Sequence, residues 1–292
     1  MHKHNLAGLM AGLGAASIWG GMYVVSKVVL EVVPPFALLT SRLVLGILAL
    51  GVVIAMRPRT SMTRQQAWQI FLVGVVGYGI SLGFQFVGTK LSTASIGSLV
   101  TSATPAFILL FAPPLLREKT TPRGVIALII STLGVIAVID PRTAELSPTL
   151  FWGNLSLLAA ALTWALYSVL VRRVTREADV AASTALMLAG GVPSSLLLGA
   201  FEVRSQGIGE ITLGIVGGIL FLGIVSTAIA MFLWNYAFAE LPAAVASLTF
   251  FAQPVVGTIL GALFLGEEIT YLFLFGGLLI AVGLVIAGTE RA

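Results

Sequence analysis

The residues that could do chemistry in this chain are few, and most lie inside long apolar runs. Both histidines, His2 and His4, lie at the N-terminus, the chain has no cysteine, and no pair of carboxylates lies within an apolar run. The sequence therefore lacks the ligands, nucleophiles and paired acids of membrane enzymes. It also lacks a glycine-rich phosphate loop followed by Lys-Ser or Lys-Thr. We expect no enzyme activity, no metal site and no cofactor.

The polar and aromatic groups that interrupt apolar runs are candidates to line a cavity that binds a small molecule. These candidates are Trp19, Tyr23, Arg42, Tyr78, Ser81, Gln85, Ser98, Ser102, Trp164, Tyr167, Asn235, Thr249 and Gln253. An unpaired amide in hydrocarbon costs several kcal/mol. Gln85, Asn235 and Gln253 must therefore either line a wet cavity or bond across helices.

Trp19 and Trp164 lie near the middle or inner part of their runs, away from the usual headgroup belt for tryptophan. They either fill a core or wall a cavity that suits a small amphiphile with an apolar side chain. Arg42 is the only charge well inside a run. It has three interpretations: a two-pronged contact to a substrate carboxylate, helix packing, or snorkelling to headgroups.

Ten apolar runs must position these side chains. Hydrophobic residues make up 58% of the 292 and charged residues 10%, a composition typical of a membrane protein. Runs of about 20 residues match the hydrocarbon thickness as helices. The sequence predicts an all-α integral membrane protein with ten transmembrane helices and its longest connections near 140–150 and 201–211. The predicted spans are 6–26, 36–56, 67–89, 92–116, 122–140, 151–171, 180–201, 212–238, 241–265 and 270–288.

The chain is a duplication of one unit. Four residues recur 149 positions later, as shown by the pairs Pro105 and Pro254, Glu118 and Glu267, Thr121 and Thr270, and Gly134 and Gly283. We predict two five-helix repeats, 1–145 and 146–292. Because five is odd, the second repeat is inverted, as in many secondary transporters. Pro105 and Pro254 are expected in the middle of their helices, where each would kink its helix, either as a hinge or as a static bend.

The basic residues predict orientation. Eleven of the sixteen Lys and Arg residues lie on the side of both termini and four on the other, with Arg42 between them. By the positive-inside rule, both termini are cytoplasmic. The net charge of +4 is spread over short loops, so we expect contact with a lipid bilayer and none with nucleic acid.

Several motifs resemble those of the drug/metabolite transporter superfamily, and specifically its EamA-type ten-helix exporters. They are the Ala-Ala-Ser-Ile-Trp-Gly-Gly run at 15–21, the paired prolines, and the Arg-Glu and Gly-Glu pairs before Thr121 and Thr270. The resemblance, which extends to bacterial amino-acid exporters, implies alternating-access export of neutral and aromatic amino acids across a bacterial inner membrane. The alternative is a multidrug or cationic-metabolite exporter of the same fold. Oligomeric state, exact substrate and coupling ion stay open.

Overall fold

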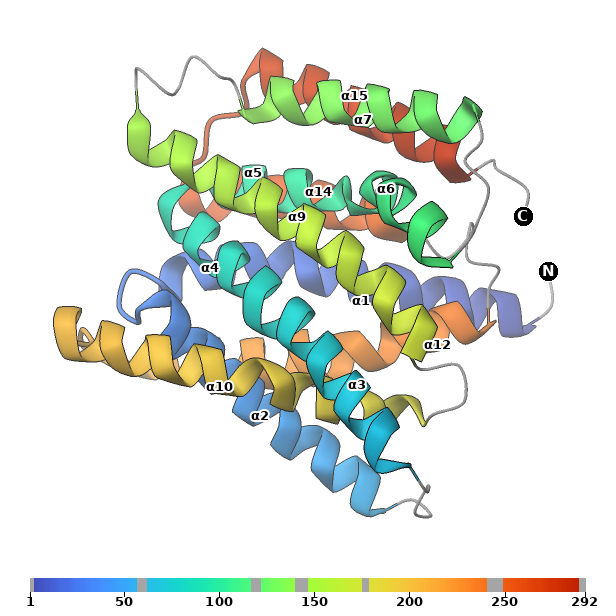
Figure 1. The fold of residues 1–292 in the computed structure, drawn as a ribbon. Helices are drawn as coiled ribbons and strands as arrows, with labels where there is room; N and C mark the ends of the chain where they lie inside the picture. The colour runs from blue at the N-terminus through green and yellow to red at the C-terminus, as the bar shows by residue number, and fades with distance from the viewer. Residues whose placement is uncertain are drawn as a thin grey trace.

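All regular structure is helical in the part of the chain that the computed structural model describes, residues 3–56, 62–116, 122–139, 147–174, 179–240 and 249–288 (Figure 1). The first half contains α1 (Lys3–Val29), α2 (Pro35–Ala55), α3 (Arg64–Gly74), η1 (Val75–Ser81), α4 (Leu82–Leu91), α5 (Ala94–Ser102), α6 (Thr104–Leu116) and α7 (Pro122–Ile139). The second contains α9 (Pro148–Val174), α10 (Val180–Gln206), α11 (Leu213–Leu220), η2 (Phe221–Ile229), α12 (Ala230–Glu240), η3 (Thr249–Phe251), α14 (Ala252–Leu265) and α15 (Tyr271–Gly288). The prediction of an all-helical chain is confirmed.

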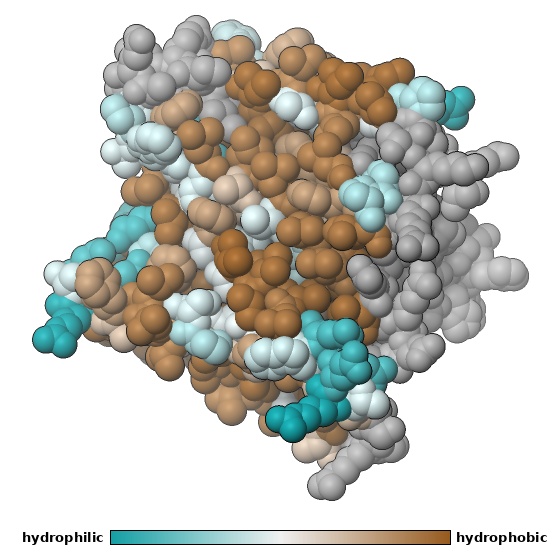
Figure 2. Space-filling model, viewed as in Figure 1, coloured by the Kyte–Doolittle hydropathy of each residue, from teal (hydrophilic) through white to brown (hydrophobic). Residues whose placement is uncertain are grey.

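The outer surfaces of these helices are apolar. Within the described residues, six helical segments are long and apolar enough to cross a membrane. Large hydrophobic side chains on these segments and on the shorter apolar helix α14 are open to the surroundings, for example Leu197 at 74%, and Leu263 at 72% and Phe264 at 73% exposure on α14. Figure 2 shows such side chains covering the middle of one face, with hydrophilic residues towards its edges. A continuous apolar surface of this kind requires lipid as its solvent.

Local signals explain where several helices begin and end. Asp179 caps α10 by accepting a hydrogen bond from the Ala182 N–H at 2.8 Å, and Gly207, with φ +76°, terminates it. The prediction that residues 201–211 form a connection is therefore wrong for its first half, because α10 continues to Gln206.

The predicted span 92–116 is broken. Helix α5 ends at Ser102 and α6 begins at Thr104, so Pro105 stands in the first turn of a new helix rather than in mid-helix. The carbonyl of Thr101 accepts a hydrogen bond from the Thr104 hydroxyl at 2.7 Å. Pro254 likewise lies in the first turn of α14, immediately after η3. Proline is tolerated there because the first turn needs no N–H donor.

Two π-helical segments, η1 and η2, interrupt the helices α3–α4 and α11–α12. Sequence periodicity did not predict them. Helices from the two halves pack against one another: α2 contacts α10, α7 contacts α15, α1 contacts α12 and α14, and α9 contacts α4 and α6 (Figure 1). In this packing η1 lies against α9 and α10, and η2 lies against α1 and α2.

Candidate functional site

A small cavity lies at the centre of the bundle. Its volume is about 50 Å³, which is room for a few water molecules. Both halves of the chain supply its walls, which are formed by Trp19, Met22, Tyr23, Arg42, Ser81, Leu82, Gln85, Thr101, Thr104, Ala160, Trp164, Met231, Phe250 and Gln253. In this conformation its free volume is smaller than an amino acid.

Arg42 is the charged group of this cavity. Its side chain is only 2% exposed, so it does not snorkel to the headgroups. Its Nε donates a hydrogen bond to Thr227 Oγ1 at 2.6 Å, and Nη2 donates to Ser226 Oγ at 3.3 Å. Its guanidinium carbon lies 5.5 Å from the centre of the Phe86 ring. Nη1 is buried and has no hydrogen-bond partner among the residues that the structure describes.

The π-segment η2 explains how Arg42 is held. Thr227 Oγ1 donates to the Leu222 carbonyl at 2.8 Å, which leaves its lone pairs turned to the Arg42 Nε. Among the described residues, no Asp or Glu forms an ion pair with this guanidinium. Within the described part of the chain, this buried positive charge thus has two polar contacts and no counter-charge, which is costly unless something supplies the opposite charge.

A polar network lies on another wall of the cavity. The Gln253 amide donates to the Ser98 carbonyl at 3.0 Å and to Thr101 Oγ1 at 2.9 Å. The hydroxyls of Tyr23 and Thr101 are 2.6 Å apart. The Gln85 amide lies 3.9 Å from the Met22 sulfur, which is a weak partner. The amides of Gln85 and Gln253 therefore both line the cavity and bond across helices.

Aromatic rings form two opposed walls. On the α1 side, the ring centroid of Trp19 lies 5.3 Å from that of Trp234 and 6.0 Å from that of Phe250. The Trp19 indole N–H donates to the Ser226 carbonyl at 3.1 Å. On the α9 side, the ring of Trp164 lies 4.6 Å from Tyr167 and 5.8 Å from Tyr78.

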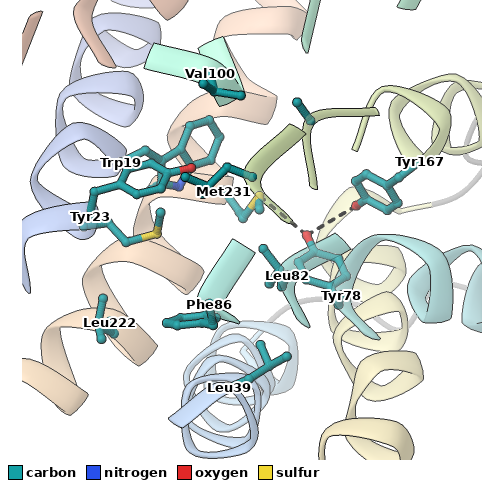
Figure 3. Close-up of a cluster of buried hydrophobic side chains, with 14 of the residues drawn as sticks. Trp19, Tyr23, Leu39, Tyr78, Leu82, Phe86, Val100, Tyr167, Leu222 and Met231 are labelled. Carbon is teal, nitrogen blue, oxygen red and sulfur yellow. Dashed lines mark hydrogen bonds between the residues drawn. The ribbon is translucent and has the colours of Figure 1, made fainter. Parts of the chain in front are cut away.

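The Tyr78 hydroxyl donates to the Met231 sulfur at 3.5 Å and accepts from Tyr167 at 3.3 Å (Figure 3). Figure 3 shows Trp19 and Tyr23 on one side of this cluster and Tyr167 on the other. Tyr78 and Tyr167 therefore support Trp164 from behind, without lining the cavity themselves.

Other predicted residues lie away from the cavity. The hydroxyls of Ser98 and Ser102 donate to carbonyls of their own helix, those of Ser95 and Leu99. Thr249 is buried beside Gly12, and Ser102 and Pro254 line a separate apolar groove between α5, α14 and α15. The side chains of Asn235 and Pro105 lie outside the described part of the structure.

Sequence reasoning missed several cavity residues, namely Met22, Leu82, Thr101, Thr104, Ala160, Met231 and Phe250. Thr104 could have been found, because it occupies the position 149 residues before Gln253. The apolar residues gave no signal, since composition does not distinguish a cavity wall from a core. Over the described residues, no group of three His, Cys, Asp or Glu side chains is placed to hold a metal ion.

Comparison with known proteins gives one family. The model of the EamA-like transporter family matches the chain twice, over residues 6–139 and 151–289. A Bacillus subtilis protein described as an uncharacterized transporter, YyaM, is 26% identical over 78% of this chain and 75% of its own length. An uncharacterized transporter of Archaeoglobus fulgidus is 25% identical over 94% of this chain and 96% of its own. One solved crystal structure has the same fold, with a TM-score of 0.67, 21% identity and 97% coverage of both chains.

Proposed function

Because this chain belongs to the EamA-like transporter family, we propose that it exports small metabolites that carry a carboxylate, namely neutral and aromatic amino acids. The chain is a multi-pass membrane transporter and not an enzyme. Its lipid-facing surface and its central cavity agree with that class. The substrate, the direction of transport and the bacterial inner membrane are our proposal.

Arg42 is the observation that carries the substrate class. It lines the cavity, is buried, has no carboxylate partner among the described residues and keeps Nη1 without a hydrogen bond. An arriving carboxylate would supply both the missing charge and the missing acceptor. A cationic drug would instead meet a like charge in a site of low dielectric. The geometry therefore favours amino acids over the cationic alternative.

The aromatic walls support an apolar substrate side chain. Trp19 and Trp164 both line the cavity, one from α1 and the other from α9. Indole rings offer large apolar faces, and the N–H of Trp19 is already bonded to a backbone carbonyl. A solute with one anionic end and one aromatic or branched end would satisfy both the arginine and the rings.

We further propose ten transmembrane helices arranged as two inverted repeats, 1–145 and 146–292. The family model matches once in each of them. The packing is also symmetric: α1 contacts α12 and α14, and its counterpart α9 contacts α4 and α6. The helices α2 and α10 pair with each other, as do α7 and α15. These relations are the ones that a two-fold axis in the membrane plane would generate.

Such a scaffold transports by alternating access. The present cavity is too small for an amino acid, so the helices around it must separate on one side and then on the other. No chemical step is needed. Binding, closure and release on the opposite side complete the cycle.

Counterflow in proteoliposomes tests the proposal. Vesicles loaded with unlabelled phenylalanine should accumulate labelled phenylalanine or leucine, with and without a pH gradient, and saturably. The amide analogues, which lack the carboxylate, should exchange at least about tenfold more slowly, since an unmade charged hydrogen bond costs roughly 1.5–3 kcal/mol.

Arg42→Met is the matched variant, because Met187 follows Arg42 by 145 residues, the same spacing that separates Trp19 from Trp164 in the proposed repeats. It should remove the preference for the acid over the amide. Exchange of tetraphenylphosphonium by the parent protein, with amino acids inert, would contradict the proposal and establish the cationic alternative.

A further inference from the structure

The short turn between α4 and α5, residues Leu91–Ala94, is bonded to side chains from three other parts of the chain. Lys27 approaches it from the end of α1, Asn154 from α9, and Glu267 from the segment after α14. Nothing in the transport chemistry described above uses these contacts. Three elements of the bundle are therefore bonded to one turn, which suggests a mechanical role for it.

Lys27 binds the end of α4. Its ammonium donates to the carbonyl oxygens of Thr89 at 3.1 Å and Lys90 at 2.8 Å, and also to that of Ser92. The last carbonyls of a helix have no N–H donor of their own and carry partial negative charge. One lysine from another helix therefore satisfies several of them together.

Glu267 binds the start of α5. After α14 the chain reverses at Gly266, with φ +65°, and the Glu267 carboxylate accepts from the N–H groups of Ala94 at 2.6 Å and Ser95 at 2.8 Å. Asn154, fully buried on α9, accepts a hydrogen bond from the Ser92 hydroxyl through its side-chain oxygen. The positive Lys27 thus binds the turn at the end of α4 and the negative Glu267 binds it at the start of α5. The Asn154 amide bonds to it between these two ends.

Following α1 and α9 away from the cavity leads to these contacts. Tyr23 precedes Lys27 by four residues and Ala160 follows Asn154 by six, which corresponds to about 6 and 9 Å of helix. Lys27 lies in the last turn of α1, Asn154 lies in α9, and Glu267 follows the end of α14. All three helices also contribute residues to the cavity wall. Separating their ends on this side of the membrane requires that these bonds break.

We propose that Lys27, Asn154 and Glu267 form a latch on the turn Leu91–Ala94 that closes the path from the cavity to the face bearing Ser205, the outer face in the proposed orientation. The inference rests on the proposed alternating access, but not on the identity of the substrate. The latch suits reversible closure because its donors and acceptors lie at a helix end, where water can replace them when it opens.

Cysteine accessibility without substrate tests the latch. The chain has no native cysteine, so Ala160→Cys places a single thiol in the cavity wall, and Ser205→Cys marks the latch side. We expect Lys27→Met or Glu267→Gln to raise labelling of the cavity thiol by a membrane-impermeant reagent at least about tenfold, only from the side where Ser205→Cys is labelled. Lys27→Arg, which keeps donors for the same carbonyls, should restore the parent rate.

Glu202→Gln is the matched control. Its carboxylate accepts from the Phe36 N–H at 2.8 Å, which is the same contact at a helix start, made between α10 and α2. The latch proposal is wrong if both latch variants are labelled within twofold of the parent rate. It is also wrong if the control variant shows an equal rise, or if the rise occurs from the opposite side of the membrane. Because the assay contains no substrate, the outcome does not depend on whether amino acids are the cargo.

Discussion

At the scale of single residues, the two halves of the site are not equivalent. In the proposed arrangement of two repeats, Arg42 and Met187 occupy corresponding positions, and only Arg42 carries a charge. The sequence singled out Arg42 but left its environment open, because the residues that hold it, Ser226 and Thr227, are about 185 positions away. Only the packing of η2 against α2 identifies these partners.

Thr227 provides the sharpest test of how Arg42 is oriented. Thr227→Val keeps the shape of the side chain but removes the acceptor of the Arg42 Nε–H. Leaving this buried charged donor unpaired should cost about 1–3 kcal/mol and raise the KM for transported amino acids roughly tenfold. Thr132→Val is the control, since the Thr132 hydroxyl donates to the Leu128 carbonyl of its own helix, α7. Equal effects of the two variants on KM would contradict a positioning role for Thr227.

Serines and threonines limited the prediction of the site. Ser102 and Thr249 are as polar as Ser81, yet only Ser81 lines the cavity. A hydroxyl can donate to a carbonyl of its own helix, as Ser102 does to Leu99, and then needs no cavity. The amides of Gln85 and Gln253 have more donors and acceptors to satisfy, and both do line the cavity.

At the scale of elements, long apolar runs predicted the positions of the described helices to within a few residues. The interruptions were not predictable in the same way. Both η1 and η2 consist largely of ordinary apolar and glycine residues. The break at Ala103 lies two residues before Pro105, where a kink was expected, but the hydrogen bond of the Thr104 hydroxyl that accompanies it was not. Helical periodicity gives the average repeat of an apolar run. A single π-turn, with one residue more than an α-turn, changes this average too little to be detected.

The break before Pro105 predicts a hinge. Pro105→Ala supplies an N–H that can bond to the Thr101 carbonyl, which now accepts from the Thr104 hydroxyl. We expect α5 and α6 to join into a stiffer helix, with the rate of exchange falling roughly tenfold and substrate affinity kept. Pro254→Ala serves for comparison. If neither variant changes the rate or the accessibility of the Ala160→Cys thiol, the prolines only shape the bundle.

Close helix packing predicts different effects on stability when alanine replaces two different glycines. A Cβ at Gly261 would lie 2.5 Å from Ser95 Oγ and 2.6 Å from Glu267 Oε2, whereas a Cβ at Gly217 would meet nothing within 4 Å. Gly261→Ala should therefore destabilise the protein by about 1–3 kcal/mol. Gly217→Ala should be neutral or stabilising by up to about 1 kcal/mol. Thermal unfolding in detergent compares the two, and equal midpoints would argue against tight packing of α14 on α5.

At the scale of the whole molecule, the excess of basic residues on one side predicts that both termini are cytoplasmic. Single cysteines at Arg59, which lies outside the described residues, and at Ser205, which is exposed in the last turn of α10, can be compared in intact cells. We expect an impermeant reagent added outside to label position 205 and not 59. Labelling of 59 alone would reverse the orientation, and with it the direction assigned to the latch.

The two π-segments have a consequence for the length of the chain. A π-turn contains one residue more than an α-turn, so η1 and η2 each hold a spare residue within a continuous helix. Deleting one residue from η1 would leave its backbone bonding intact as an α-helix. Because a π-turn completes one rotation with its extra residue, the deletion would rotate α4 against α3 by far less than the ~100° that a residue lost from an α-helix causes, and Gln85 would still face the cavity. At these two places the protein can therefore lose a residue without unfolding a helix and without turning the neighbouring helices away from the cavity.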